Sequence, residues 1–392
     1  MPKVLILANK VPYPSKDGSS IAMARLLENF IELETHDITY GALNPIKHRK
    51  AITDFPCAIK KNITLKSFEV NTSPTLSRAL TNLLFTRQPF HTIRFFVFSM
   101  QKWLERFDDN HFDLVVLEGA FMGHYFPLAM LKGKKVVLRS HNLEHVIWER
   151  SINNIGSPLK RFYLNIQTSR LKKFEQNLAM LVHSVWSISS IDMHWFKSFN
   201  VNTFFVPVSI KKQEMNMKIV SKRCFFLGAL DWIPNLESLQ WFLREVWPLV
   251  NKLDQSIEFH VAGNNTPKKI KALKAHNLHV HGKVPNAESF SKNHGVSIIP
   301  LLSGSGVRIK LLENGSFGIP TVSTTIGAEG VYDMNNSKIP ISDIPEELAK
   351  EIVALTTDSN KAAHIAQELY TDINNRFSAQ NAMASIQQGW PK

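Results

Sequence analysis

The residues best suited to chemistry in this chain lie between positions 303 and 313. Ser303–Val307 is a Gly/Ser loop, and Arg308, Lys310 and Glu313 follow it within an apolar helical pattern. We expect the loop to open a helix, so that free backbone N–H groups and the positive end of the helix dipole point outward. A helix terminus of this kind binds anions. The segment adds two cations and a carboxylate that accepts hydrogen bonds from hydroxyl groups. It therefore indicates a site for a phosphate and a sugar.

A second group of candidates follows the predicted strands of the chain. Parallel α/β sheets bind ligands beyond the carboxyl ends of their strands. The residues expected at such positions are Gly18, His141, Gly228, Asn264 and Glu329. The imidazole of His141 offers hydrogen bonding or acid–base chemistry. An ordinary structural role is the alternative for Gly18, Glu329 and above all His141.

Short apolar runs alternate with helical patterns, which predicts parallel sheets covered by helices on both faces. In the first part of the chain the predicted strands are Val4–Ala8, Ile38–Tyr40, Ile63–Phe68, Leu114–Leu117, Val136–Leu138, Val185–Ile188 and Phe204–Val208, and the predicted helices are Ile21–Leu33, His91–Phe107, Leu159–Ala179 and Ile191–Phe199. In the second part the predicted strands are Cys224–Leu227, Ile257–Ala262, Leu278–Val280, Val296–Pro300 and Thr321–Ser323. The helices expected there are Leu236–Leu253, Lys268–His276, Ala287–Asn293, the helix after Gly306, Pro345–Thr356, Lys361–Asn374 and Ser378–Gln388.

The length of 392 residues exceeds that of one typical domain, and the hydrophobic fraction of 44% is sufficient for two cores. A basic, polar stretch at 211–223 separates the two series of strands and helices. We therefore predict two Rossmann-like domains. The first spans 1–208 and is completed by a C-terminal crossover helix within 376–392, and the second spans 209–375.

The segment from 303 to 325 resembles the donor-binding region of glycosyltransferase family 4, in the subgroup whose motif reads roughly G-x-G-x-R-x-K-x-x-E. The motif positions are Gly304, Gly306, Arg308, Lys310 and Glu313. The resemblance continues closely through 320–330, 226–235 and 245–249, and more loosely through 11–18 and 140–145.

This resemblance implies the GT-B architecture, in which two Rossmann-like, doubly wound domains face a central cleft. It implies an acceptor-binding N-terminal domain and a donor-binding C-terminal domain. The expected enzyme is a retaining glycosyltransferase of the hexosyltransferase type. It moves a sugar from a nucleoside-diphosphate sugar to a glycan, a lipid-linked acceptor or another hydroxyl. Cell-surface polysaccharide or glycoconjugate synthesis is the expected setting.

The resemblance also assigns roles to residues. The expected catalytic residues are His141, Arg308, Lys310 and Glu313, and the expected donor-binding residues are Gly18, Gly228, Asn264, Gly304, Ser305, Gly306 and Glu329. The family's E-x7-E motif is incomplete, because Ser305 stands eight positions before Glu313. Backbone N–H groups of the Gly/Ser loop are then expected to hold the donor sugar. Donor identity stays open at this point.

Family 4 enzymes generally need no metal, and neither a D-x-D motif nor a Cys/His cluster is visible in the sequence. We therefore expect no metal and no other cofactor. Cys57 and Cys224 lie in different predicted domains, which fits a reducing cytoplasm. The apolar run after Met1 is too short for a signal peptide. The expected location is the cytoplasm, or the periphery of the cytoplasmic face of the inner membrane.

The formal net charge of +13 attracts polyanions such as phosphate donors and anionic lipids. The stretch 78–106 mixes aromatic residues with Arg and Lys, so it is a candidate for contact with an anionic membrane surface. The alternative is that its aromatic residues are core. A nucleic-acid partner is not expected, because no RNA-binding motif is visible. A catalytically degenerate nucleotide-binding GT-B protein and a sugar-nucleotide epimerase are the other functions considered.

Overall fold

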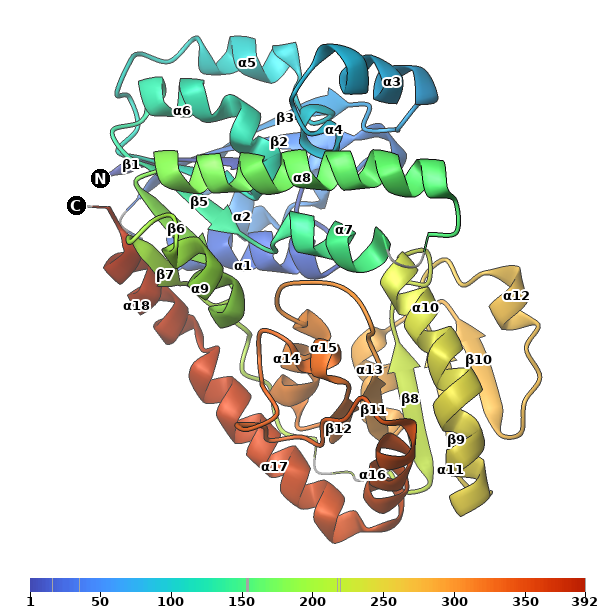
Figure 1. The fold of residues 1–392 in the computed structure, drawn as a ribbon. Helices are drawn as coiled ribbons and strands as arrows, with labels where there is room; N and C mark the ends of the chain where they lie inside the picture. The colour runs from blue at the N-terminus through green and yellow to red at the C-terminus, as the bar shows by residue number, and fades with distance from the viewer. Residues whose placement is uncertain (16, 35, 153–154, 217, 219, 392) are drawn as a thin grey trace. The chain divides into compact units, whose positions relative to one another are not determined.

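The computed structural model describes residues 1–15, 17–34, 36–152, 155–216, 218 and 220–391. The chain forms two compact units (Figure 1). Unit 1 consists of Met1–Ser209 and Ala379–Lys392, and unit 2 consists of Ile210–Ser378. The sequence prediction placed the first boundary after residue 208 and the return of the chain at residue 376, so both lie close to the observed ones.

Unit 1 contains, among its described residues, a seven-stranded sheet in the order β3-β2-β1-β4-β5-β6-β7, with each neighbouring pair parallel. The strands are β1 (Lys3–Ala8), β2 (Asp37–Pro45), β3 (Ile63–Val70), β4 (Leu114–Glu118), β5 (Val136–Ser140), β6 (Ser184–Ser187) and β7 (Thr203–Phe205). The helices are α1 (Gly18–Glu32), η1 (Ile46–His48), η2 (Ile52–Asp54), α2 (Cys57–Lys60), α3 (Leu76–Phe85), α4 (Phe90–Ile93), α5 (Phe98–Leu104), η3 (Ala120–Tyr125), α6 (Phe126–Lys132), α7 (Glu144–Ile152), α8 (Pro158–Leu181), α9 (Ser190–Lys197) and α18 (Ala379–Gly389).

The apolar run of β1 is buried on both faces of this sheet, as expected for a central parallel strand. Successive side chains of a strand point to opposite faces. Val4 and Ile6 therefore pack in one core cluster with α1 and α18, while Leu5 and Leu7 pack in another with α5 and α8. The carboxyl end of β1 is thereby held at the middle of the sheet.

Unit 2 contains, in the part of it that the structure describes, a five-stranded parallel sheet in the order β10-β9-β8-β11-β12. The strands are β8 (Arg223–Leu227), β9 (Glu258–Ala262), β10 (Leu278–Gly282), β11 (Val296–Ile299) and β12 (Thr321–Ser323). The helices are α10 (Ile233–Trp241), η4 (Phe242–Val246), α11 (Trp247–Leu253), α12 (Lys268–Lys271), α13 (Ala287–Asn293), α14 (Ile309–Phe317), α15 (Thr325–Ala328), α16 (Pro345–Thr357) and α17 (Ser359–Arg376).

Helices cover both faces of this second sheet as well. Cys224 and Phe226 of β8 belong to the core under α10, α11 and α16, and Phe225 packs on the opposite face against Phe290 of α13. Gly318 ends α14 with a φ of 68°, a left-handed conformation that glycine adopts without strain. The turn at Gly318 sends the chain directly into β12.

The predicted fold class, two Rossmann-like parallel α/β domains, is confirmed. The helix predicted over 91–107 is wrong, because the structure breaks it into α4 and α5. The backbone N–H of Val97 donates to the Tyr125 hydroxyl at 2.7 Å, and that hydroxyl donates to the Phe95 carbonyl at 3.2 Å. These peptide groups therefore bond to a side chain distant in sequence instead of continuing a helix.

The helix predicted over 236–253 is a composite of α10, the π-helical turn η4 and α11. Pro248 stands in the first turn of α11, where its missing N–H costs least. Of the helix predicted over 268–276, only α12 is helical. No helix within the described ranges combines the length and the apolar character needed to cross a bilayer.

Candidate functional site

Each sheet has one position where its strand order reverses, and candidate residues lie near this position. In unit 1 it lies between β1 and β4, and in unit 2 between β8 and β11. Ligands of doubly wound sheets bind beyond the carboxyl ends of the strands at such a point. The predicted residues follow these ends: Gly18 after β1, His141 after β5, Gly228 after β8, Asn264 after β9 and Gly304–Gly306 after β11.

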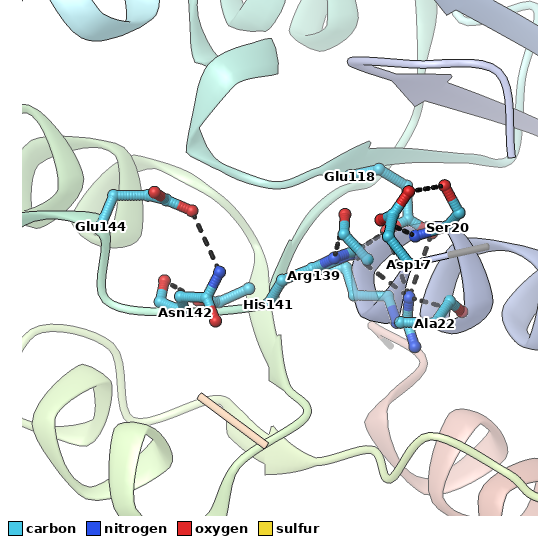
Figure 2. A network of polar contacts seen from close by, with 10 residues as sticks. Asp17, Ser20, Ala22, Glu118, Arg139, His141, Asn142 and Glu144 are labelled. Atoms are coloured by element: carbon cyan, nitrogen blue, oxygen red, sulfur yellow. Dashed lines mark hydrogen bonds and ion pairs between the residues drawn. The ribbon is translucent and has the colours of Figure 1, made fainter. Parts of the chain in front are cut away.

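A buried polar network occupies the carboxyl edge of the sheet in unit 1 (Figure 2). Glu118 ends β4, and it pairs in register with Arg139 of β5. Arg139 Nη1 lies 3.3 Å from Oε1 and 3.1 Å from Oε2 of the Glu118 carboxyl. His141 Nε2 forms a short hydrogen bond with Glu118 Oε2, and its Nδ1 lies 3.4 Å from the Ser19 hydroxyl. The predicted residue His141 is thus part of a buried set of three.

The charges of this network fix the protonation of its members. Burial by itself raises the pKa of Glu118, but the charges and hydrogen bonds of Arg139 and His141 hold that pKa below its usual range. Burial also lowers the pKa of His141, and Glu118 opposes this only in part. Glu118 is therefore ionised and accepts the Nε2–H of a neutral imidazole. The lone pair of His141 Nδ1 then faces the start of α1, where it can accept a hydrogen bond from a hydroxyl group.

The side chain of Asp17 caps the N-terminus of α1. Asp17 accepts hydrogen bonds from the backbone N–H of Ser20 at 3.0 Å and from its hydroxyl at 2.8 Å. Lys10 Nζ lies 2.5 Å from Asp17 Oδ1. Burial alone raises the pKa of Asp17, but Lys10 and the two Ser20 bonds outweigh it and lower this pKa to about 2. Gly18 therefore begins a helix whose N-terminal charge is already partly balanced.

A second carboxyl in unit 1 has the opposite character. Burial, followed by the charge of Glu175, raises the pKa of Glu144 to about 8. Asn142 Nδ2 donates to Glu144 Oε1 at 3.3 Å (Figure 2). Glu175 is itself held by the backbone N–H of Glu144 and by His145 Nδ1, at 2.9 and 2.7 Å. Glu144 is therefore a protonated carboxyl at neutral pH, beside the ionised Glu118 network.

In unit 2, the Gly/Ser loop after β11 differs from the predicted geometry. The loop itself does not open the helix, because α14 begins at Ile309 and Arg308 is its N-cap residue. Gly304 has a φ of 130° and Gly306 a φ of 79°, values that a right-handed helix does not allow. The two glycines instead make a separate, buried loop ahead of the helix.

Arg308 holds this loop against the segment after β12. Its Nε donates to the Ile326 carbonyl at 2.9 Å, and its Nη1 donates to the Ser305 carbonyl at 2.8 Å. Its Nη2 lies 3.6 Å from Glu329 Oε2, and both side chains are buried. The structure thus brings together Arg308, Glu329 and the Gly304–Gly306 loop. The guanidinium positions the loop in addition to carrying charge.

Lys310 and Glu313 form a separate pair on α14. Lys310 Nζ lies 3.1 Å from Glu313 Oε2, and both side chains are about one third exposed. Neighbours three positions apart on a helix commonly pair in this way. Both side chains are therefore reachable by a ligand, whereas Arg308 is enclosed.

The strand ends that carry Gly228 and Asn264 are locked by close backbone contact. Gly228 N donates to the Ala262 carbonyl at 3.0 Å, and Leu230 N donates to the Asn264 carbonyl at 2.9 Å. A Cβ atom added to Gly263 would lie 1.8 Å from the Gly228 carbonyl oxygen. Residue 263 must therefore be glycine for β8 and β9 to end side by side.

Two kinds of functional candidates were missed from the sequence. Glu118 and Arg139 each directly follow or extend a predicted buried strand, and a charged residue at that place was the available signal. The sequence shows no Cys/His cluster, but the structure brings four histidines together. Pairing of β9 with β10 brings His260 beside His279 and His281, and His294 at the end of α13 joins them. The spacing of His279 and His281, two apart on one strand, was the signal here.

Comparison with known proteins agrees with this geometry. Residues 221–358 match the family model described as glycosyl transferases group 1. A Klebsiella pneumoniae protein described as an uncharacterized 44.6 kDa protein in the cps region is 22% identical over 401 residues, spanning 98% of this chain and 99% of that protein.

Two solved structures share the fold over nearly their whole length. TarM superposes with a TM-score of 0.67 at 11% identity, covering 100% of this chain and 99% of that one. Anabaena HepE, solved with UDP and glucose, superposes with a TM-score of 0.63 at 12% identity, covering 99% of each chain. Residues 221–358 thus match the group 1 glycosyl transferase model, and the chain as a whole has the fold of these two structures.

Proposed function

We propose that this protein transfers a sugar from a nucleoside-diphosphate sugar to a hydroxyl of a glycan or lipid-linked acceptor. The proposed transfer retains the anomeric configuration and needs no metal ion. Its proposed setting is the synthesis of cell-surface polysaccharide or glycoconjugate. The observation that carries the proposal is the buried contact of Arg308 with both Glu329 and the Gly/Ser loop, inside the segment that matches group 1 glycosyltransferases.

Unit 2 is the proposed donor side. Its Gly304–Gly306 loop presents backbone groups at the carboxyl edge of the sheet, and Lys310 and Glu313 are accessible just beyond it. In the proposed complex the loop and the first turn of α14 bind the diphosphate, and Lys310 adds positive charge. Glu313 accepts the ribose hydroxyls, and Glu329, positioned by Arg308, accepts hydroxyls of the sugar. Gly228 and Asn264 form the wall of the nucleotide pocket.

Catalysis on this proposal is mainly electrostatic. Negative charge develops on the diphosphate as the bond to the sugar breaks, and donors already fixed in place stabilise it without reorganising. The acceptor oxygen forms its bond to the anomeric carbon on the face that the diphosphate leaves, which retains the configuration. A phosphate oxygen of the departing diphosphate takes the acceptor proton. No covalent intermediate with the protein is required.

Unit 1 is the proposed acceptor side. His141 is held neutral, with its Nε2–H donated to Glu118 and its Nδ1 turned toward Ser19. A neutral Nδ1 accepts a hydrogen bond from an acceptor or sugar hydroxyl and so orients it. Glu144, protonated at neutral pH, supplies a donor on the same edge of the sheet. The pair gives one acceptor and one donor for sugar hydroxyls.

We further propose that the stretch 78–106, together with the first residues of α3, contacts an anionic membrane. Phe90 is buried and Phe95 and Trp103 are partly buried, as core residues are, but other apolar side chains are exposed. The exposed ones are Leu76, Leu80, Leu84, Phe85, Phe96 and Phe98. A hollow of about 340 Å³ beside them is lined in part by Arg78 and Arg94. Exposed apolar side chains next to cations suit a lipid surface with anionic headgroups.

Sedimentation with lipid vesicles tests the membrane contact. We expect binding to phosphatidylglycerol vesicles, little binding to phosphatidylcholine vesicles, and loss of binding in Leu84→Glu/Phe85→Ser. Leu159→Glu/Phe162→Ser is the matched control, because these two residues are also largely exposed, on α8 of the same unit. Equal effects of both double variants, or equal binding to both kinds of vesicle, would contradict the proposed membrane contact.

Thermal stabilisation by nucleotides tests the donor site. We would measure the untagged chain with UDP, GDP, ADP and CMP in the absence of metal. A ligand at 100 times its dissociation constant stabilises the native state by about 2.7 kcal/mol. We expect one diphosphate to stabilise the wild type and Lys292→Ala, a control on a partly exposed cation of α13, but not Arg308→Ala. No stabilisation by any nucleotide would contradict the proposal.

Product analysis separates the proposed reaction from its alternatives. Incubation of the stabilising nucleotide's sugar donors with hydroxyl acceptors should release the diphosphate and give a glycoside of unchanged anomeric configuration by NMR. Conversion of the donor into an epimer without an acceptor would indicate an epimerase. Binding without turnover of any donor would indicate a degenerate nucleotide-binding protein.

A further inference from the structure

Four histidines gather on one face of the sheet in unit 2. His260 lies on β9, His279 and His281 lie on the edge strand β10, and His294 follows α13. The ring of His260 lies 4.8 Å from that of His279, 5.2 Å from that of His281 and 4.5 Å from that of His294, measured between centroids. The residues that the proposed donor site uses follow the carboxyl ends of the strands, whereas His260 lies within β9 and His294 precedes β11.

Hydrogen bonds to the outer nitrogens of His294 and His260 decide which nitrogen of each ring points inward. His294 Nδ1 lies 2.7 Å from the Phe290 carbonyl oxygen, which only accepts, so Nδ1 carries the proton and Nε2 is a lone pair. His260 Nε2 lies 3.3 Å from Glu258 Oε2, so Nε2 carries the proton and Nδ1 is a lone pair. His260 Nδ1 faces His281 Nε2 at 2.9 Å.

We propose that His260, His281 and His294 bind one divalent transition-metal ion of the zinc class. Each residue offers one nitrogen, and the three nitrogens lie within 4.8 Å of one another. Nitrogens bound to a tetrahedral zinc ion at 2.0–2.1 Å are about 3.3 Å apart, so small side-chain rotations bring the three into place. Imidazole nitrogens suit zinc, nickel and cobalt better than magnesium or calcium.

The surroundings of the three rings resemble a prepared metal site. Ligating histidines usually donate their other N–H to a carboxylate or a backbone carbonyl, which fixes the ring and its tautomer. Glu258 does this for His260 and the Phe290 carbonyl does it for His294. Glu258 is itself held by Arg223 Nε at 2.7 Å. His260 is buried, whereas His281 is exposed, so the fourth position of a bound ion faces water.

Without metal, His281 Nε2–H donates to the lone pair of His260 Nδ1. Metal binding requires that proton to move to His281 Nδ1, which is an ordinary change of tautomer in a neutral ring. No net proton is released by this step. The bound ion would join β9, the edge strand β10 and the end of α13, and would therefore stabilise unit 2. This role is independent of the proposed transfer reaction.

Equilibrium dialysis of the untagged chain against Zn²⁺, and the visible absorption of bound Co²⁺, test the site. We expect one ion per chain. His281→Ala and His294→Ala should each weaken binding by at least 10-fold, and Glu258→Gln, which removes an outer partner, by about 10-fold. His279→Ala is the matched control, because His279 stacks on His260 but is not a proposed ligand, and its affinity should be unchanged.

Each outcome decides the proposal. Absence of binding, or binding unchanged in both His281→Ala and His294→Ala, would overturn it. Loss of binding in His279→Ala with retention in His294→Ala would overturn this ligand set in favour of Glu258, His260 and His279. Circular dichroism of every variant, together with its nucleotide-induced stabilisation, checks that a lost site is not a lost fold.

Discussion

Glu118 and Arg139 stand opposite each other on β4 and β5 and form an ion pair in which the two side chains are 0% and 1% exposed. The pair is 3.1 Å long, and Arg139 also donates to the Ala22 carbonyl at 3.2 Å. It therefore ties the start of α1 to the strand ends that carry His141. A charge pair removed from water in this way is tolerated only when both partners are present.

Removing one partner should be costly for this reason. We expect Glu118→Gln to lower the free energy of unfolding by about 3–5 kcal/mol, because it leaves the Arg139 guanidinium buried without a counter-charge. Denaturant unfolding measures the loss. Glu149→Gln, which breaks an exposed pair with Lys172 in the same unit, should cost no more than about 1 kcal/mol. Similar losses in the two variants would contradict the burial argument.

Glu144 should make stability depend on pH. Its pKa is raised from 4.5 to about 8 by burial and by the charge of Glu175. Between these values the folded state keeps a proton that the unfolded state releases, so the free energy of unfolding falls as pH rises through the window. Below the window both states are protonated and the effect disappears.

Glu144→Gln removes this titration. Relative to wild type, the variant should gain stability with rising pH by up to about 1.4 kcal/mol per unit within the window, as measured by denaturant unfolding. Glu149→Gln, a change to an exposed carboxylate on the same helix, serves as the control. A difference between Glu144→Gln and wild type that stays constant with pH would refute the assignment.

Gly263 should tolerate no side chain. The added Cβ of Gly263→Ala would lie 1.8 Å from the Gly228 carbonyl oxygen, so β8 and β9 must part at the edge where the nucleotide is proposed to bind. We expect a loss of about 1–3 kcal/mol in stability, together with loss of nucleotide-induced stabilisation. Gly156→Ala, where a Cβ meets nothing within 4 Å, should change stability by less than about 0.5 kcal/mol. The two variants are compared by thermal melting with and without nucleotide.

Lysine at position 308, in Arg308→Lys, should not support nucleotide binding as arginine does. Lysine keeps the charge but cannot reach the Ile326 and Ser305 carbonyls together, because it lacks the planar fork. We expect nucleotide affinity to fall at least 10-fold, which is about 1.4 kcal/mol, in a calorimetric titration. An affinity equal to wild type would mean that charge alone suffices and that the loop needs no such support.

Much of the fold could be predicted because it depends on local patterns. Buried apolar runs marked the strands, and the ranges predicted for α13 and β12 coincide with those observed. The polar loops after strands were likewise visible, and they led to His141 and to the Gly304–Gly306 loop. Predictions failed where a distant residue decides the outcome, as at 95–97, where Tyr125 takes the peptide groups that a helix would have used.

The contacts between residues of the candidate site could not be predicted for the same reason. Glu118 and Arg139 become neighbours only through the register of β4 with β5, and His260 meets His279 only through that of β9 with β10. Single-sequence patterns do not fix these registers. Arg308 was singled out in the motif, but its geometry depends on Ile326 and Glu329, which come into contact only once β12 and α15 are in place.

The divided composition of unit 1 has a consequence for how the protein is made. Ribosomes release the chain in order, so unit 2, a single continuous segment, emerges before α18 does. Until then the core of unit 1 lacks Ile386, and the indole N–H of Trp186 lacks the Gly389 carbonyl that it donates to at 2.8 Å. We therefore expect a released chain truncated before α18 to contain the whole of unit 2 and an incomplete unit 1, and to depend on chaperones.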